Sequence, residues 1–516
     1  MKVMQLRLNP LPSLTSLLLA GSITTLSAQN QNNFWAYGFG AGIDFNSTPP
    51  SFVGGNAMYS SEGAASIADS NTGELLFYTN GVTVWDASNN PMPNGDALLG
   101  GTPELLSSTT AAVICEKPGS EGSYYIFTID EQSSNNGVRY SVVDMALNGG
   151  LGDVVAGQKN IPVLTTNSEK MCVAPNAQGT GFWLITHNGS DTYYAFSITS
   201  AGVSSTPVTS LIGPYQVNGA GFMKISPQLD RIAVANIFFQ NAEVFDFDRS
   251  TGVISNPVVI DTPFFGAAGG PYGIEFSCSG DFLYVSDGSS VKQFNLTAGS
   301  ESDIIASAYT VTSNSFSCYG LQLGPDRKIY ISNGALDVIE NPDVAGAGCG
   351  YSANAIANQT SGGGWGLPQW VFRVGDDPLV CEACQINLSI TSSTTGCGNQ
   401  TEYTITANGA GPFTFEIPAL GLSNTTGTFV LGSGNYQVEV TDAAGCSSST
   451  ELTNSTGTSC PQDFDSDFVV GVTDLQLFNA AYGCAGDCCP YDLTNDNAVS
   501  VADLLVFITA FGEYCE

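Results

Sequence analysis

The sequence predicts a mainly β fold, whose largest part is a six- or seven-bladed β-propeller. Between about residues 30 and 378 the chain is rich in glycine and in short strand patterns, and helical periodicity is scarce. A unit of strand, polar turn and strand recurs there about every 45 to 60 residues. Three clear copies begin at Gly221, Gly273 and Gly320, and looser copies begin near Gly63, Ser108 and Met171. Six copies of three or four strands are typical of a propeller.

Two aromatic segments, 34–40 and 366–373, lie outside these six copies at opposite ends of the region. We expect them to pair and close the ring, either as one mixed blade or as a seventh. The inner strands are predicted to be small and apolar because side chains crowd at a propeller axis, and the aromatic residues of the second strands are predicted to fill the gaps between blades. An array of β-sandwiches is the alternative, but sandwich strands would not recur with this turn spacing.

Several motifs relate this region to known proteins. They are Phe34-Trp-x-x-Gly-x-Gly-x-Gly-Ile-Asp-Phe, Asn80-Gly-Val-Thr-Val-Trp85, and Arg139-Tyr-Ser-Val-Val-Asp-Met145 followed by Leu147-Asn-Gly-Gly-Leu-Gly-Asp153. With them, the region resembles a family of secreted β-propeller proteins found in Bacteroidetes. The resemblance implies a propeller over residues 29–378 and an extracellular location. It implies no particular activity, because propellers host many functions.

Short alternating strands follow the propeller region, such as Tyr403-Thr-Ile-Thr-Ala and Tyr436-Gln-Val-Glu-Val-Thr441. The stretch from Gly434 to Cys446 is similar to the adhesin-type immunoglobulin-like repeats of gliding bacteria. We therefore interpret residues 379–455 as a small immunoglobulin-like β-sandwich that acts as a spacer, with Cys397 and Cys446 as candidate disulfide partners. A carbohydrate-binding module is the alternative, although the segment shows no aromatic platform.

The end of the chain carries two near-copies of an Asp-rich loop, at 460–474 and 489–503. A calcium ion takes oxygen ligands from positions 1, 3, 5, 7, 9 and 12 of such a loop, with a backbone carbonyl at position 7. The candidate ligands are Asp463, Asp465, Asp467, Val469 and Asp474 in the first loop, and Asp492, Thr494, Asp496, Ala498, Ser500 and Asp503 in the second. Since Thr494 is a neutral donor, we expect the second site to be the weaker one.

A helical pattern follows each loop, and Gly483 and Gly512 are the predicted C-caps. A loop plus a single helix, present twice, resembles the dockerin type I module. The resemblance implies a small α-helical module with paired EF-hand-type calcium sites over residues 456–516, and a cohesin-like protein as a candidate partner. Position 6 departs from the usual glycine, because Phe468 and Asn497 stand there, so we expect an altered or strained turn.

Two alternatives compete with calcium at this end of the chain. The loops could be acidic, solvated surface segments that bind no metal. The cysteines at 484, 488, 489 and 515 could instead form a zinc site, although no histidine accompanies them.

Composition favours an exported protein. Residues 1–28 are predicted to be a signal peptide, because Lys2 and Arg7 precede an apolar stretch that ends in small residues. No other stretch is long and apolar enough to predict a transmembrane helix. Thirteen basic residues against 47 acidic ones, a formal charge of −34, argue against nucleic acid or an anionic membrane as a partner. Fourteen cysteines in an exported chain favour disulfides over thiol chemistry.

Catalytic motifs are scarce. The single histidine, His187, excludes sites that need two, and we expect it to bond to a turn. Asp69, Glu275 and Asp326 lie on or beside strands and are interpreted as ordinary turn carboxylates. The sequence therefore predicts a secreted or cell-surface, non-enzymatic binding or adhesion protein with Ca²⁺ as its cofactor and a glycan or a cell-surface protein as a candidate partner. The alternative is a secreted hydrolase acting on polysaccharide, which would need a suitably spaced carboxylate pair.

Overall fold

A computed structural model describes residues 30–514 with short gaps. The gaps are 103–105, 132–135, 166–167, 215–218, 262–263, 265, 267, 314–317, 357–358, 360–362, 380–386, 395–400, 409–411, 432–433, 442–446, 455–460, 466, 487–488 and 495. The predicted signal peptide, at 1–28, lies outside the described residues. None of the helices in the described part combines the length and the hydrophobicity needed to cross a lipid bilayer.

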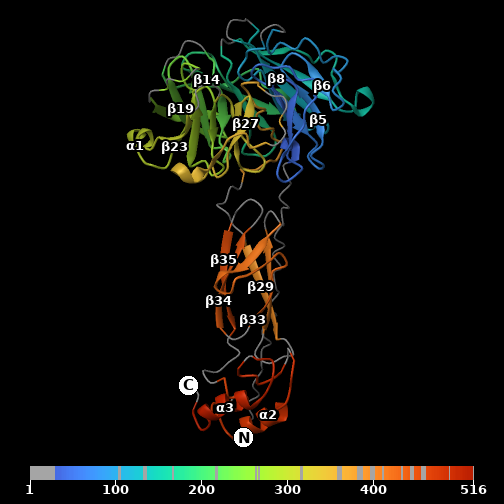
Figure 1. The fold of residues 1–516 in the computed structure, drawn as a ribbon. Coiled ribbons are helices and arrows are strands. Elements are labelled where there is room, and N and C mark those ends of the chain that lie inside the picture. The colour runs from blue at the N-terminus through green and yellow to red at the C-terminus, as the bar shows by residue number, and fades with distance from the viewer. Residues whose placement is uncertain are drawn as a thin grey trace, which may run out of the picture.

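Antiparallel sheets built from consecutive strands make up the large first part of the chain (Figure 1). The first three are β1 (Phe34–Tyr37), β2 (Ala41–Asp44) and β3 (Ser51–Phe52); β4 (Ala65–Ala68), β5 (Leu75–Thr79) and β6 (Val84–Asp86); and β7 (Ala112–Glu116), β8 (Ser123–Ile129), β9 (Val138–Asp144), β10 (Asp153–Val154) and β11 (Ile161–Leu164). The fourth contains β12 (Met171–Pro175), β13 (Phe182–His187), β14 (Thr192–Thr199), β15 (Gly202–Val203) and β16 (Val208–Leu211).

Three four-stranded sheets follow. They are β17 (Met223–Ile225), β18 (Arg231–Asn236), β19 (Asn241–Asp248) and β20 (Val253–Ile260); β21 (Ile274–Phe276), β22 (Phe282–Ser286), β23 (Ser290–Asn295) and β24 (Tyr309–Ser313); and β25 (Leu321–Leu323), β26 (Ile329–Asn333), β27 (Ala335–Ile339) and β28 (Tyr351–Ser352). The short helix α1 (Glu301–Ala306) joins β23 to β24. The described residues before 380 thus form seven sheets.

The sheets form a ring, as in a β-propeller. The first strands of successive sheets, β4, β7, β12, β17, β21 and β25, contact one another in that order. The ring closes where the first sheet meets the last, because the Trp35 ring lies edge-on to the Tyr330 ring with centroids 5.4 Å apart. The segment around Trp365 completes the axis: its N–H donates to the carbonyl of Ser61 (2.7 Å), and its carbonyl accepts from the N–H of Gly320 (2.7 Å). The first sheet, of β1, β2 and β3, also contacts β4 of the second sheet. Residues 366–373 form no strand of these sheets in the described part of the chain, but they lie against the first segment, where the Val371 N–H donates to the Asn32 side chain (2.8 Å).

Hydrophobic side chains fill the interfaces between neighbouring sheets. The cluster between β18 and β22, for example, includes Ala233, Val244, Ile274 and Phe294, all fully or almost fully buried. The prediction that inner strands are small and apolar holds for β4 and β7 but is wrong for β17, β21 and β25, where Lys224, Glu275 and Gln322 face one another. A charged residue can lie there because its partners come from neighbouring blades.

Two sheets pack face to face in the middle of the chain. One holds β29 (Asn387–Thr394), β30 (Thr401–Asn408) and β33 (Thr428–Leu431), and the other holds β31 (Thr414–Ile417), β32 (Leu422–Asn424), β34 (Gly434–Thr441) and β35 (Ser447–Asn454). Their shared core contains Ile405 and Phe429 from the first sheet and Ile417 and Val438 from the second. The predicted Cys397–Cys446 bridge lies outside the described residues.

The end of the chain forms two helices, α2 (Val472–Ala481) and α3 (Val501–Ala510). Phe478 and Phe507 are fully buried between them, with ring centroids 5.6 Å apart. Gly483 and Gly512, the predicted C-caps, follow the helices with φ of 86° and 91°, a conformation that suits glycine.

Cysteine usage agrees with the prediction in part. Cys484 and Cys489 form a disulfide. The zinc interpretation is therefore wrong, because two of its four ligands are joined to each other. In addition, Cys115, Cys172, Cys318 and Cys349 are free thiols buried in the propeller. They behave as small apolar residues between packed strands, and burial raises the pKa of the Cys172 thiol to about 12.

Candidate functional site

The two Asp-rich loops bring their carboxylates together. Asp463, Asp465, Asp467 and Asp474 each offer an oxygen that lies within 4.8 Å of the others. Asp492, Asp496 and Asp503 do the same in the second loop. In the described part of the chain, these two groups have the donor set that a hard cation such as Ca²⁺ prefers.

The acid at position 12 ties each loop to its helix. Asp474 is fully buried, and its carboxylate accepts from the N–H groups of Phe464 (2.6 Å), Asp465 (3.1 Å) and Gly471 (2.7 Å). Asp503 is buried in the same way and accepts from the N–H groups of Thr494 and Ser500, both at 2.8 Å. These bonds fix the loop shape before any ion is considered.

The sixth position adopts the left-handed backbone conformation in both loops, with φ of 67° at Phe468 and 63° at Asn497. This region favours glycine and tolerates asparagine better than a bulky side chain. The N–H groups of these residues donate to Asp463 (2.9 Å) and Asp492 (2.8 Å), respectively. The sharp turn at position 6, which the sequence predicted to be altered or strained, is therefore present in both loops. We expect backbone strain at Phe468, because a bulky side chain stands at a left-handed position.

In the second loop, the neutral hydroxyl groups donate hydrogen bonds to the carboxylate of Asp503 in the same loop. The Thr494 hydroxyl donates to Asp503 (2.9 Å), and the Ser500 hydroxyl donates to the other oxygen of Asp503 (3.2 Å). Burial acts to raise the pKa of Asp503, but hydrogen bonds from Ser500 and Thr494 outweigh it and hold this pKa below its usual range. At position 7, Val469 and Ala498 pair with Tyr514 and Ala485 in isolated bridges.

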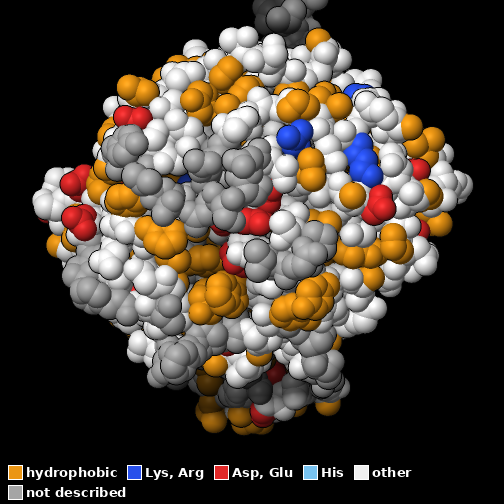
Figure 2. All heavy atoms as spheres, turned by 90° about the horizontal axis from the view of Figure 1, so that it is seen from above, with side chains coloured by type: hydrophobic (Ala, Val, Ile, Leu, Met, Phe, Trp, Pro, Cys, Tyr) orange, Lys and Arg blue, Asp and Glu red, His pale blue; other side chains and the backbone are white. Residues whose placement is uncertain are grey.

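A second candidate site lies where the axis of the propeller opens on one face. Six positions lie two or three residues before the first strand of a sheet, and Trp365 lies beside them through its backbone bonds to Ser61 and Gly320. Together they form what we call the mouth ring: Glu62, Thr109, Glu169, Ala220, Tyr272, Tyr319 and Trp365. Backbone hydrogen bonds join neighbouring positions, such as Phe222 N–H to the Tyr272 carbonyl (2.9 Å). Figure 2 looks onto one face of the propeller, where acidic side chains lie near the middle and hydrophobic ones beside them.

One half of the mouth ring is acidic. The hydroxyl of Thr109 lies 2.7 Å from a carboxylate oxygen of Glu169 and 3.5 Å from one of Glu62. The Tyr272 hydroxyl donates to the same oxygen of Glu62 at 2.6 Å. Burial raises the pKa of Glu62 to about 7, against the effect of the Tyr272 hydrogen bond, and repulsion from Glu169 adds to the shift.

The other half is aromatic. The rings of Tyr319 and Trp365 stack at 4.4 Å with an interplanar angle of 9°, and Tyr272 lies edge-on to both. Trp365 is 44% exposed, whereas Tyr272 is 2% exposed. Phe39 and Tyr59, whose rings are 5.1 Å apart, add exposed aromatic surface beside Gly363, close to Trp365 in the chain.

Lys170 and Glu275, two further buried charges of the propeller, have structural partners. The Lys170 ammonium donates to the carbonyls of Gly219 (2.8 Å) and Ala220 (2.6 Å), and burial lowers its pKa to about 7. Glu275, interpreted from the sequence as a turn carboxylate, instead lies 3.3 Å from the Lys224 ammonium in a buried ion pair.

The other sequence candidates serve turns and packing. His187 accepts a hydrogen bond from the N–H of Gly189 (3.0 Å), and burial lowers its pKa to about 3, so it is neutral. Asp69 accepts from the N–H groups of Asn71 and Thr72, both at 2.9 Å. Asp326 accepts from the Tyr330 hydroxyl at 2.8 Å. Each of these groups therefore bonds to a neighbouring turn or strand.

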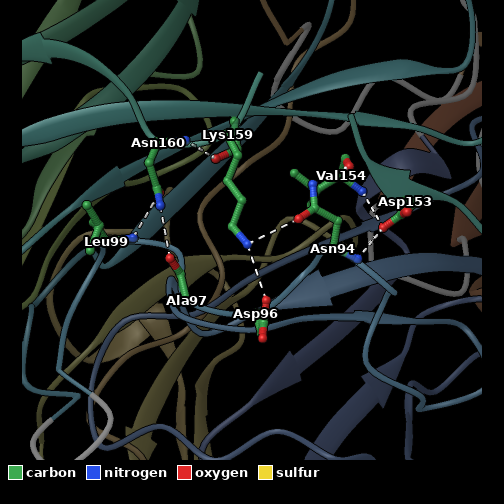
Figure 3. A network of polar contacts seen from close by, with 9 residues as sticks. Asn94, Asp96, Ala97, Leu99, Asp153, Val154, Lys159 and Asn160 are labelled. Atoms are coloured by element: carbon green, nitrogen blue, oxygen red, sulfur yellow. Dashed lines mark hydrogen bonds and ion pairs between the residues drawn. The ribbon is translucent and has the colours of Figure 1, made fainter. Parts of the chain in front are cut away.

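A cavity of about 550 Å³ lies at the periphery, lined by residues that include Asn94, Asp153 and Lys159. Figure 3 shows that its polar groups bind one another across two blades. The Asn94 N–H donates to Asp153 (2.7 Å), and the Lys159 ammonium pairs with Asp96 at 3.2 Å. The Asn160 side chain bonds to the backbone of residues 97 and 99. We interpret this network as a set of polar contacts that stabilise the packing of the three-stranded second sheet against the third.

The sequence predicted that the carboxylates of the two tail loops lie together, but it did not predict a site at the mouth ring. Each member lies within two residues of the start of a repeat copy or of the second aromatic segment. Its identity changes from Glu to Thr, Ala, Tyr or Trp, so no motif marks it. The position acquires meaning only once the ring closes.

No known family model matches the chain, and no curated protein sequence matches it. Among solved structures, the chain is similar to a functionally unknown protein from Desulfotomaculum acetoxidans, with 13% identity and a TM-score of 0.36 over 65% of this chain and 98% of the other. It is also similar to the Cps50 (Swd1) β-propeller domain of Myceliophteria thermophila, with 11% identity and a TM-score of 0.35. That match covers 59% of this chain and 91% of the other. A third similar structure is a putative 6-phosphogluconolactonase from Bacteroides uniformis. It shares 15% identity with the chain, with a TM-score of 0.32, and the match covers 76% of this chain and 100% of the other. These values carry no information on activity.

Proposed function

We propose that the protein is a secreted or cell-surface binding and adhesion protein without enzymatic activity, and that its propeller binds a glycan at the mouth ring. The exposed Trp365 indole, stacked on Tyr319, carries this proposal. A flat, partly exposed aromatic pair buries apolar area against the CH face of a sugar ring, while neighbouring polar groups bind hydroxyls. Phe39 and Tyr59 would extend the surface to a further sugar unit.

The test is titration of the full chain with glycan oligomers, followed by tryptophan fluorescence and calorimetry. Trp365→Ala should lower the affinity of any bound glycan at least tenfold, because the stacking surface is removed. Leu211→Ala, which removes an exposed apolar side chain from the outer strand β16, is the control. Equal binding by wild type and Trp365→Ala would contradict the assignment of the mouth ring.

For the end of the chain we propose a dockerin-like module whose paired EF-hand-type loops bind two Ca²⁺ ions. The supporting observation is the convergence of four carboxylates in one loop and three in the other. Carboxylates held this close repel one another, so an ion that binds only the folded loop adds its binding free energy to folding. A cohesin-like or other cell-surface protein is the proposed partner, and the two-sheet sandwich is an immunoglobulin-like spacer.

Calorimetric titration of the chelator-treated full chain with calcium tests this proposal. We expect two binding events and a higher melting temperature for the helical module. Magnesium at the same concentration is the control, because it is smaller and demands stricter octahedral geometry. No heat of binding and no change in melting temperature would refute the calcium assignment.

One observation favours the hydrolase alternative. Glu62, whose pKa is raised to about 7, and Glu169 both approach the Thr109 hydroxyl, as an acid and base pair could. Both carboxylates are, however, more than nine-tenths buried and engaged in hydrogen bonds within the protein. Turnover of a bound oligosaccharide that is abolished by Glu62→Gln would establish the hydrolase and displace the binding proposal.

A further inference from the structure

The chain itself fills the propeller axis beneath the mouth ring. In the segment that follows Trp365, the Val371 side chain packs with β4 and β7 in one hydrophobic cluster, and the Phe372 side chain packs with β7 and β12 in another. Trp370 lines a cavity of about 30 Å³ together with residues of β17, β21 and β25. A segment can reach all six of these inner strands only if it runs along the axis. A ligand at the mouth therefore rests on protein and cannot pass through the ring.

Hydrogen bonds anchor this axial segment along its length. At the top, the Trp365 N–H donates to the Ser61 carbonyl (2.7 Å). In the middle, the Asn32 side chain accepts from the Val371 N–H (2.8 Å) and donates to the Val371 carbonyl (3.1 Å). Further along, the Leu379 N–H donates to the carbonyl of Pro227 (2.9 Å). Because a ligand would have to break these bonds to displace the segment, the mouth is a shallow site with a fixed floor.

Trp365 offers a ligand one face of its ring. The other face is covered by Tyr319, which is stacked on it with centroids 4.4 Å apart and an interplanar angle of 9°. A single sugar stacked on such an open surface buries only part of its area, whereas a ligand pocket encloses most of a small molecule. Useful affinity must therefore come from contacts with several sugar units.

A second aromatic surface lies next to Trp365. A Cβ on Gly364 would lie 2.7 Å from the backbone of the turn between β1 and β2, and this turn carries Phe39. The rings of Phe39 and Tyr59 are 5.1 Å apart, and Tyr59 is 61% exposed. Ser61, which binds the Trp365 N–H, follows Tyr59 by two residues, so the backbones of Tyr59 and Ser61 are separated by at most about 7 Å. The two aromatic surfaces are thus within reach of neighbouring units of one chain.

These surfaces do not form one flat plane. The rings of Phe39 and Tyr59 meet at an interplanar angle of 63°, so at most one of them can be coplanar with Trp365. A flexible, single polysaccharide chain can turn from one ring face to the next, whereas the flat face of a crystalline polysaccharide needs coplanar rings.

We propose that the mouth ring binds the interior of a single, linear polysaccharide chain, with one sugar ring on Trp365 and further units of the same chain over Tyr59 and Phe39. This inference rests on the proposed glycan-binding function and deepens it by naming the kind of ligand and how it lies. A free monosaccharide or a terminal sugar would need an enclosing pocket. A chain that lies across the closed floor of the mouth can instead leave the site on both sides.

The test is calorimetric titration of the full chain with oligosaccharides of one, two, four and six units from three linear series, namely cello-, manno- and xylo-oligosaccharides. In the series that binds, we expect affinity to rise about tenfold from two to six units, because the outer units then reach Tyr59 and Phe39. The monosaccharide should bind too weakly to measure. Reduction of the terminal sugar of the hexamer to its open-chain alditol should leave the affinity unchanged, since no chain end is recognised.

Two variants separate the aromatic surfaces. Tyr59→Ala should lower the affinity for the hexamer about fivefold to tenfold and leave that for the dimer unchanged, because the dimer reaches only Trp365. Trp365→Ala should lower both affinities. Leu211→Ala, on β16, is the control and should bind both oligosaccharides as wild type does. Since Tyr59 is 61% exposed, its replacement should not change the melting temperature of the propeller.

The outcomes distinguish this inference from the glycan-binding proposal on which it rests. If a monosaccharide or dimer binds as tightly as the hexamer, or if terminal reduction abolishes binding, recognition of the chain interior is overturned while glycan binding stands. An unchanged affinity of Tyr59→Ala for the hexamer would also overturn it. If no oligosaccharide of the three series binds the wild-type chain, both proposals fall.

Discussion

Replacing Glu62 by glutamine should stabilise the propeller at neutral and alkaline pH. Burial raises the pKa of this carboxyl from its ordinary value of 4.5 to about 7. The folded state therefore binds a proton more tightly than the unfolded state does. The stabilisation this gives is fully present below pH 4.5 and is lost as the pH rises to about 7, because the ionised form is buried at a cost.

The magnitude follows from that shift. A difference of about 2.5 pKa units corresponds to about 3 kcal/mol in the free energy of unfolding, at 1.36 kcal/mol per unit. Glutamine retains an oxygen that accepts from the Tyr272 hydroxyl, which bonds to Glu62 at 2.6 Å in the wild type. It cannot ionise, so the variant should lack this part of the pH dependence.

Denaturant unfolding followed by tryptophan fluorescence measures the effect on the propeller alone. All five tryptophans, Trp35, Trp85, Trp183, Trp365 and Trp370, lie in that part of the chain. We expect the difference between variant and wild type to grow by about 3 kcal/mol between pH 4.5 and 8. Glu131 also titrates with a raised pKa, but it is present in both proteins and cancels in the difference. A difference that stays constant over this range would refute the reasoning.

Three further predictions concern other parts of the chain. Asp463→Ala and Asp492→Ala should each remove one calorimetric calcium site, with the larger loss for the first; equal losses would contradict the ranking of the loops. Phe468→Gly should raise the melting temperature of the helical module by relieving about 1 kcal/mol of backbone strain at φ 67°, and Asn497→Gly should do less; the reverse order would be inconsistent with strain. Lys224→Met should destabilise the propeller by about 3 to 5 kcal/mol in fluorescence-detected unfolding because Glu275 loses its partner, whereas Lys224→Met with Glu275→Met should recover most of that loss; two additive losses would argue against the ion pair.

Local spacing made the tail loops predictable from the sequence. The candidate ligands of one loop lie within twelve residues of one another, so their pattern can be read without knowing the fold. The same holds for Gly483 and Gly512, which end helices that begin nearby. The propeller repeat was visible for a similar reason, because each strand, turn and strand unit is continuous in the chain.

Contacts between distant copies could not be read in this way. Lys224, Glu275 and Gln322 lie on three successive inner strands, so nothing near Glu275 in the sequence marks it as part of an ion pair. The mouth ring shows the same limit, since Tyr272 and Glu62 are 210 residues apart. Cys172 and Cys349 could not be distinguished by composition from cysteines that form disulfides, because the burial that leaves them free depends on blade packing.

Asp503 in the tail and Glu62 in the propeller are held in opposite protonation states. In the second tail loop, backbone and hydroxyl donors lower the pKa of Asp503, so it stays ionised well below neutral pH. In the propeller, burial raises the pKa values of Glu62, in the mouth ring, and of Glu131, just after strand β8, to about 7, so both are partly protonated at neutral pH. Calcium binding at the second loop should therefore vary little between pH 6 and 8, whereas the wild-type propeller should lose stability over that range as Glu62 ionises. The physical difference lies in the donors: the tail surrounds its carboxylates with N–H groups, and the propeller leaves one oxygen of Glu131 without a partner among the described residues.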